Sequence, residues 1–465
     1  MRPRSLLSIF FLLPFFWLTA QVPVDLKARL DKTLDSMRIK IKSVALSGAM
    51  VLPDGNVWTA ASGTAAQDPF VAADPNQLYL IGSVTKTLIS AAILQLAEKD
   101  QLALDDKISI WITRHPNIDT NITIRHLLRH QSGLYDILSN QALNIEMLTH
   151  QQAIFDPWNS ITRYLQPALF SPGTQWSYSN TNYFLLGIII QKITGQTYYE
   201  YLREHIFEPQ GLSSFAIPAY EELNGDVCHV WLDTNGDQLN EDAHIFYSNY
   251  LALNSMAGAA GGYYSTSADL ARWIYNFIRG EVVNGEWVKE AQKTVFASGV
   301  PNGTYGLGLM KKAFLGYTGY GHGGDLGYSA SAWYFPDKEV SIAVLNNDAN
   351  NNSWALVPVI QALLKTYNDW ASTTTASADL VSSTDLLLYP NPAINTLFVK
   401  SDAISNIKNI DSWIYNAQGI RQSVQRFDKE NGSVAFEVSQ LPAGMYQIVL
   451  HVNGVVICTQ KFVKS

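Results

Sequence analysis

The spacing of apolar residues changes from extended to helical near residue 80. Residues 78–81 form a short, continuously apolar run of strand length, and Gly82 and Ser83 follow it. Beyond them, apolar residues recur at offsets of three and four, as on one face of an amphipathic helix, at Leu88, Ile89, Ala92, Ile93 and Leu96. The pattern predicts a strand, a turn at Ser83 and a helix that starts there.

Similar patterns predict the elements on either side of this turn. Apolar residues three or four positions apart predict helices over residues 26–37 and 354–364. Apolar runs bounded by turn residues predict strands over 44–50, 57–61, 331–335 and 340–345. The residues between the two strand pairs are mostly helical in pattern, apart from an irregular insertion at 221–250. This order predicts an α+β fold, in which helices flank an antiparallel sheet and a helical subdomain is inserted.

The composition changes at residues 371–384, where Ser, Thr and Ala dominate. We interpret this segment as a linker. After it the chain shows alternating patterns and no helical one, which predicts short strands over 397–399, 413–415, 434–438 and 446–452. About 80 residues of this kind predict a small all-β sandwich.

The first residues have the pattern of a signal peptide. Arg2 and Arg4 precede an apolar run over residues 6–18, and small residues follow up to Ala20. The alternative is a membrane anchor, but Pro14 interrupts a run that is already shorter than the roughly 20 apolar residues of a spanning helix. We therefore predict a signal peptide (1–20), a main domain (21–370), the linker (371–384) and the sandwich (385–465), with no transmembrane span after cleavage.

Net charge and cysteine content exclude some classes of function. A net charge of −8 gives no reason to expect nucleic acid or an anionic membrane surface as a partner. The two cysteines, Cys228 and Cys458, lie in different predicted domains, so we expect neither a structural disulfide nor a cysteine-based metal site.

Ser83 and Lys86 form a Ser-x-x-Lys motif at the predicted strand-to-helix turn. One helical turn brings the Lys86 amine back to the side of the Ser83 hydroxyl. An amine that can take the hydroxyl proton would activate the serine as a nucleophile. The same motif occurs at residues 405–408, but no helical pattern follows it there, so the context favours Ser83.

Tyr178 and Asn180 form a Tyr-x-Asn motif that leads directly into a predicted helix. A phenol can pass a proton to a leaving group if neighbouring cations lower its pKa, and an amide can hold a substrate carbonyl. A second Tyr-x-Asn motif, at residues 247–249, lies in the irregular insertion. We therefore take the first as the functional candidate.

A third motif enters a predicted strand pair and comprises His322, Gly323, Gly324 and Asp325. Glycines let a substrate lie against the strand edge, and backbone N–H groups there can stabilise an oxyanion. Because glycines flank the histidine on both sides, a purely structural role for it is less attractive than usual.

The order of these three motifs resembles that of the serine β-lactamase and penicillin-binding-protein superfamily. The similarity is greatest to its class C-like branch, which includes D-alanyl carboxypeptidases, D-aminopeptidases and esterases. It extends over residues 26–367 and includes the connecting segments 123–134, 172–187, 209–212 and 265–270. The resemblance implies a β-lactamase/transpeptidase-like fold and no cofactor.

The resemblance also implies a role for each motif residue. Ser83 would be the acylated nucleophile, and Lys86 and Tyr178 would share general base and acid work, with the first proton acceptor left open. Asn180 would hold the substrate amide or acyl group, and His322 would take the place of a third-motif lysine. The backbone N–H groups of Ser83 and Asp325 would form the oxyanion hole.

The third motif departs from the Lys-Thr-Gly of many relatives. Histidine is largely neutral near pH 7, and the hydroxyl that often binds a substrate carboxylate is missing at Gly323. We therefore expect an esterase or a peptidase for D-amino-acid substrates rather than an efficient β-lactamase. The alternative is a non-catalytic protein of the same fold that binds a peptide, a glycan fragment or penicillin.

The tail resembles a type IX secretion C-terminal sorting domain. The similarity lies in residues 388–392, 441–446 and 461–464. With the signal peptide, it implies passage through the periplasm to the cell surface or medium, with the secretion machinery as a partner. The alternative is an adhesive or carbohydrate-binding β-module.

Residues 233–238 resemble the start of a Ca²⁺ loop, with oxygen ligands at Asp233, Asn235 and Asp237. Gln238 stands where such a loop has its glycine, and His244 stands where it has its last glutamate. These departures favour a solvated turn, so we expect no metal.

Overall fold

The computed structural model describes residues 21–237, 239–244, 250–300, 303–378, 387–400, 410–416, 421–429, 433–452 and 455–465. The predicted signal peptide and the second copies of the two motifs, at 247–249 and 405–408, lie outside these residues. Within these ranges, no helix is long and apolar enough to cross a membrane.

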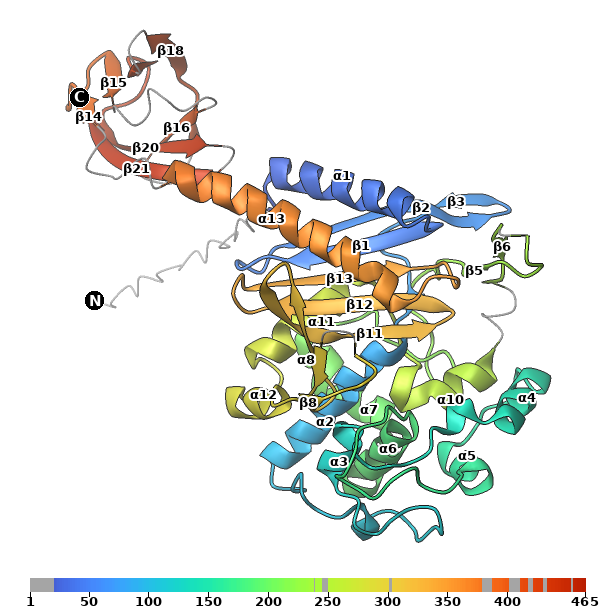
Figure 1. Cartoon of the computed structure of the whole chain (residues 1–465). Coiled ribbons are helices and arrows are strands. Elements are labelled where there is room, and N and C mark those ends of the chain that lie inside the picture. The colour runs from blue at the N-terminus through green and yellow to red at the C-terminus, as the bar shows by residue number, and fades with distance from the viewer. Residues whose placement is uncertain are drawn as a thin grey trace, which may run out of the picture.

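A nine-stranded antiparallel sheet forms the centre of the molecule (Figure 1), in the order β3-β2-β1-β13-β12-β11-β10-β9-β8. These strands are β1 (Ala45–Val51), β2 (Val57–Gln67), β3 (Phe70–Ala72), β8 (Val295–Phe296), β9 (Gly303–Tyr305), β10 (Met310–Phe314), β11 (Tyr317–Leu326), β12 (Tyr328–Phe335) and β13 (Val340–Asn346). β1 pairs with β13 inside the sheet, with Ala49 opposite Ala343, so strands about 300 residues apart in the sequence lie side by side. The two predicted hairpins and the α+β fold are thereby confirmed.

Two helices from the ends of the fold cover one face of the sheet (Figure 1): α1 (Val24–Lys40) and α13 (Val357–Ala378). The predicted apolar positions of α1 are buried, and they share one core cluster with Val359 and Leu363 of α13. α13 extends to Ala378, into the segment that we interpreted as a linker. No glycine or proline interrupts residues 371–378, and extending an existing helix is far easier than nucleating one.

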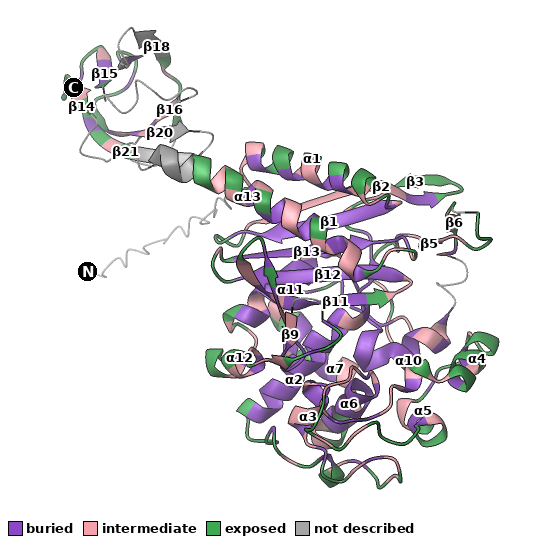
Figure 2. Ribbon diagram, viewed as in Figure 1, coloured by how far each residue is buried: buried purple, intermediate pink, exposed green. Residues whose placement is uncertain are grey.

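The opposite face carries α2 (Thr85–Glu98), α11 (Ser267–Arg279) and the helical subdomain. Its remaining helices include α3 (Ile124–Leu128), α4 (Gln141–Thr149), α5 (Pro157–Tyr164), α6 (Thr181–Thr194), α7 (Tyr198–Leu202), α10 (Leu251–Gly261) and α12 (Gly285–Ala291). The sequence predicted one buried face for α2, yet the helix is buried on all sides from Thr85 to Ala97 (Figure 2). It carries no charged residue between Lys86 and Glu98, so it can run between the sheet and the subdomain.

The insertion and the tail follow the sequence patterns. Among its described residues, the insertion has two short strands, β5 (Trp231–Leu232) and β6 (Glu241–Asp242). The tail forms two four-stranded sheets, β14-β15-β19-β18 and β17-β16-β20-β21. Leu397 from one sheet and Ile414 from the other belong to one buried cluster, as expected for a small all-β sandwich.

Candidate active site

Ser83 lies in a tight turn between a short strand and the buried helix α2. The strand is β4 (Tyr79–Leu80), and the turn is the 3₁₀ segment η1 (Gly82–Val84). Gly82 has a φ of +52°, and a Cβ there would lie 2.6 Å from the backbone nitrogen of Asp325. Ser83 itself is half-buried, whereas its neighbours in this run are buried. Ser83 thus lies at a strand-to-helix turn, as the apolar pattern predicted, and is less buried than its neighbours.

Lys86 is fully buried, and its Nζ lies within hydrogen-bond distance of three oxygens. They are Ser83 Oγ at 2.9 Å, Asn180 Oδ1 at 2.8 Å and Ala260 O at 2.7 Å. Burial lowers the pKa of Lys86 to about 7, and the Asp136 carboxylate opposes this shift. When neutral, the amine can donate its two N–H groups to the two carbonyl oxygens, which only accept. Its lone pair is then left for the Ser83 hydroxyl proton.

Tyr178 is the second motif residue that contacts Ser83. Its phenol hydrogen bonds to Ser83, and the Lys86 Nζ lies 4.9 Å from its ring centroid. We expected nearby cations to lower the pKa of this phenol. Burial instead raises the pKa of Tyr178 well above its ordinary value, and the bond to Ser83 offsets this only in part. The phenol therefore stays protonated and can donate a proton.

Asn180 uses both ends of its amide within the protein. Its Oδ1 accepts from Lys86, and its Nδ2 donates to Asp136 Oδ2 at 2.8 Å. The sequence analysis missed Asp136 because the same carboxylate also accepts from Leu138 N and so has the pattern of an ordinary N-cap. Burial raises the pKa of Asp136, and the hydrogen bonds from Leu138 and Asn180 oppose this shift.

The third motif brings β11 into direct contact with the Ser83 turn. A Cβ at Gly324 would lie 2.0 Å from Ile81 O and 2.8 Å from Ser83 N, so only glycine allows this approach. The Asp325 carboxylate accepts from Ser353 N at 2.5 Å and from Ser353 Oγ at 2.7 Å. Its side chain is thus committed to Ser353, and its backbone lies beside that of Gly82.

His322 lies beside Tyr178 but is only 1% exposed. Its Nε2 is 2.9 Å from Tyr305 Oη, and its Nδ1 contacts Gly323 O. Burial and the nearby Lys86 lower the pKa of His322 to about 3. We predicted that His322 would take the place of a third-motif lysine. That correspondence stays a prediction, and the side chain itself is neutral with both ring nitrogens engaged.

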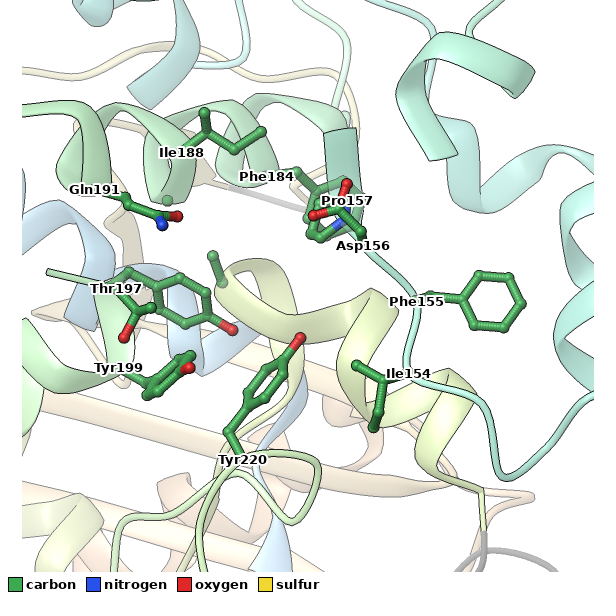
Figure 3. Close-up of a pocket in the computed structure, with 13 residues that line it drawn as sticks. Ile154, Phe155, Asp156, Pro157, Phe184, Ile188, Gln191, Thr197, Tyr199 and Tyr220 are labelled. Carbon is green, nitrogen blue, oxygen red and sulfur yellow. The ribbon is translucent and has the colours of Figure 1, made fainter. Parts of the chain in front are cut away.

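A cavity of about 260 Å³ lies next to this group, on the other side of α10. Figure 3 shows aromatic side chains around it, among them Tyr199 and Tyr220, which are stacked with ring centroids 4.7 Å apart. Ala259 lines the cavity, and the carbonyl of the next residue, Ala260, accepts from Lys86. None of the three motifs contributes to its lining.

The loop that resembles a Ca²⁺ site brings three carboxylates together, from Asp233, Asp237 and Glu241, with oxygens within 4.8 Å of one another. Glu241 was not among the residues of the loop resemblance, which named Asn235 as a possible oxygen ligand. Asn235 Nδ2 instead donates to Glu241 Oε1 at 3.0 Å, and the backbone N–H groups of Thr234 and Gly236 donate to carboxylates of the loop. The solvated turn that the sequence favoured stays a prediction.

Comparison with known proteins agrees with this geometry. Residues 31–361 match the sequence model of the beta-lactamase family. The putative penicillin-binding protein PbpX of Bacillus subtilis is 28% identical over 272 residues, which are 58% of this chain and 63% of that protein. A D-aminopeptidase of Brucella ovis is 27% identical over 294 residues, or 62% of this chain and 54% of that protein. The chain thus spans less than two thirds of either relative.

Among solved structures, a D-stereospecific amidohydrolase from Streptomyces superposes with a TM-score of 0.61 at 27% identity. The match covers 70% of this chain and 94% of that one. Residues 387–465 match a secretion system C-terminal sorting domain, which indicates export to the cell surface or beyond.

Proposed function

This chain belongs to the beta-lactamase family, and from that membership we propose that it is a secreted serine hydrolase that acts through an acyl-Ser83 intermediate. The observation that carries the proposal is the 2.9 Å contact between Ser83 Oγ and a buried amine, Lys86, whose pKa is lowered to about 7. A lysine in this state is a competent general base at neutral pH.

In the acylation step, the Ser83 hydroxyl oxygen attacks the substrate carbonyl carbon while its proton passes to the neutral Lys86 amine. The high pKa of Tyr178 favours Lys86 as the first acceptor and Tyr178 as a proton donor. The backbone N–H groups of Ser83 and Asp325 stabilise the developing oxyanion. Collapse of this intermediate breaks the bond to the leaving group, which takes the Tyr178 proton; the Lys86 ammonium then reprotonates Tyr178, so that Lys86 is neutral again.

Hydrolysis of the acyl-enzyme repeats these transfers with water. Lys86 takes a proton from the attacking water, the ester bond to Ser83 breaks, and Ser83 Oγ recovers its proton. Asn180 holds the Lys86 amine in line with Ser83, while its own amide is held by Asp136. This bond to Lys86 supports a role for Asn180 in positioning the base.

The substrates of this reaction are esters, amides or D-amino-acid peptides. The names of two relatives, a D-aminopeptidase and a D-stereospecific amidohydrolase, support the amide and peptide classes. The neutral His322 supplies no cation for a substrate carboxylate, so efficient β-lactam hydrolysis is less favoured.

We also propose the division into a hydrolase domain (21–370) and a sorting domain (385–465). The tail would engage the secretion machinery after the chain has crossed into the periplasm.

A serine-directed fluorophosphonate tests the proposal. Mass spectrometry of the treated chain should find one adduct on the peptide that contains Ser83, and Ser83→Ala should abolish it. A penicillin probe extends the test, since a long-lived adduct would point to peptidase ancestry. If neither probe labels Ser83 in the folded protein, the non-catalytic binding protein is the better description.

A further inference from the structure

Three buried side chains form a hydrogen-bonded chain behind Tyr178. His130 Nε2 lies 3.2 Å from Tyr305 Oη, and Tyr305 Oη lies 2.9 Å from His322 Nε2. All three residues are at most 1% exposed. Of the three residues, only His322 belongs to one of the three motifs. His130 lies in the segment 123–134, and Tyr305 ends β9, so three distant parts of the chain meet here.

The backbone fixes which nitrogen of His130 carries its proton. Ser179 N–H donates to His130 Nδ1 at 3.1 Å, so Nδ1 must be an acceptor. Asn182 Nδ2 donates to the same atom at 3.0 Å, and its Oδ1 accepts from Ser132 Oγ, which fixes the orientation of that amide. His130 is therefore neutral, with its proton on Nε2, and donates to the Tyr305 oxygen.

At the other end of the hydrogen-bonded chain, a backbone group also fixes which nitrogen of His322 carries a proton. Gly323 O can only accept, so His322 Nδ1 must carry a proton. Because buried His322 is neutral and carries its proton on Nδ1, its Nε2 is bare and accepts the single Tyr305 proton, while the Tyr305 oxygen accepts from His130. Tyr183, which is also close to His130, donates its own proton to Leu128 O at 3.0 Å. The two histidines thus hold opposite tautomers.

This arrangement controls the segment that contains Tyr178 and Asn180. The His130 ring lies against the Tyr178 ring, with centroids 4.2 Å apart, and His130 also holds the backbone N–H of Ser179 between the two motif residues. A second proton on His130 would place its Nδ1–H against the Ser179 N–H donor, and a second proton on His322 would remove the acceptor of the Tyr305 proton. The groups that face the chain are Lys86, Tyr178 and Tyr183, and the charge of Lys86 also opposes protonation of both histidines.

We propose that His130 and Tyr305 are positioning residues: they hold His322 neutral with its proton on Nδ1 and fix Tyr178 against Ser83. The catalytic part of this inference rests on the proposed function. The tautomers do not, because they follow from the hydrogen bonds and the complete burial of the two rings.

The first test reads the tautomers in the complete mature chain. Magic-angle-spinning NMR of protein labelled with ¹⁵N-histidine distinguishes Nδ1–H from Nε2–H rings among the nine histidines. His130→Gln and His322→Gln assign the two signals, and Tyr305→Phe should shift both if either of those variants fails to fold. We expect Nε2–H for His130, Nδ1–H for His322, and no titration of either between pH 5 and 9. The reverse tautomer in either ring, or titration of either ring in this range, would overturn the proposal.

The second test separates positioning from stability. Tyr305→Phe removes both phenol bonds of the hydrogen-bonded chain, to His130 and to His322. Tyr328→Phe removes a buried phenol bond outside it, from Tyr328 Oη to Cys228 O at 2.7 Å. With p-nitrophenyl butyrate, Tyr305→Phe should lower kcat about tenfold or more with little change in KM, because a misplaced acid or base slows the chemical step. Tyr328→Phe should leave kcat within about twofold of that of the unmodified chain.

Equal kcat values in the two variants would show that the hydrogen-bonded chain of His130, Tyr305 and His322 has only a structural role. If the unmodified protein hydrolyses no ester at all, the proposed function fails, while the NMR result still decides the tautomers.

Discussion

Lys86 combines complete burial with three polar contacts, and this combination decides its protonation. Burial excludes water and so disfavours the ammonium form of Lys86. The Asp136 carboxylate has the opposite effect and favours the ammonium form. Asn180 lies between the two and bonds to both. Burial thus sets the pKa of Lys86, and Asp136 moderates it without contacting Ser83 or Lys86 directly.

The pH dependence of acylation tests this arrangement. Only neutral Lys86 can take the Ser83 proton, so kcat/KM should rise with pH through about 7 and level off above it. The Asp136 carboxylate raises the pKa of Lys86, and its removal in Asp136→Asn should move this rise to lower pH. A pH profile of fluorophosphonate labelling measures both.

Asp156→Asn is the matched control for this shift. Asp156 also caps a helix, since its Oδ1 accepts from Asn159 N at 2.7 Å, but it does not influence Lys86. Its profile should coincide with that of the unmodified chain. If the labelling rate of Asp136→Asn rises at the same pH as that of the unmodified chain, the electrostatic link between Asp136 and Lys86 is contradicted.

At the scale of elements, the site depends on how closely β11 approaches the Ser83 turn. Gly324 and Gly82 each lack the Cβ that would separate the two backbones, and the oxyanion-hole proposal requires this contact. The strand and the turn come from opposite ends of the family domain. Their contact is therefore a property of the folded sheet rather than of either segment.

Gly324→Ala should disrupt this contact. The added Cβ would lie 2.0 Å from Ile81 O, and no side-chain rotation can relieve a clash with backbone. We expect a loss of at least about 2 kcal/mol in the free energy of unfolding and loss of fluorophosphonate labelling. Gly285→Ala is the control, because a Cβ there meets nothing within 4 Å. Denaturant unfolding and labelling, measured on both variants, would refute this view if Gly324→Ala matched Gly285→Ala.

The sequence patterns predicted the positions of the helices and strands better than they predicted how deeply these elements are buried. Apolar spacing and turn residues correctly placed the two hairpins, the terminal helices and the Ser83 turn. Periodicity could not show that α2 is buried on all sides, because burial depends on partners remote in sequence. The same reason hid Asp136, His130 and Tyr305. Each has an ordinary local pattern, and only tertiary contacts bring it to the motifs.

At the scale of the whole molecule, the hydrophobic cores show whether the tail packs into the same core as the family domain. Two clusters lie on the two faces of the large sheet, and a third contains only tail residues, among them Leu397, Ile414 and Phe462. No described residue belongs to both the tail cluster and the other two. This separation supports the proposal that 385–465 act as a secretion address rather than as part of the catalytic unit.

A chain that ends after Ala378 tests this independence. It keeps all of α13 and both clusters of the large sheet, so its melting temperature and its rate of Ser83 labelling should equal those of the full chain. A chain that ends after residue 364 should be less stable by about 2–5 kcal/mol, because it loses Tyr367 from the core and the bond from Trp370 Nε1 to Asp25 Oδ2 at 2.9 Å. Calorimetry and labelling compare the two. If ending at Ala378 weakens labelling as much as ending at 364, the tail supports the site directly, and its role is more than that of an address.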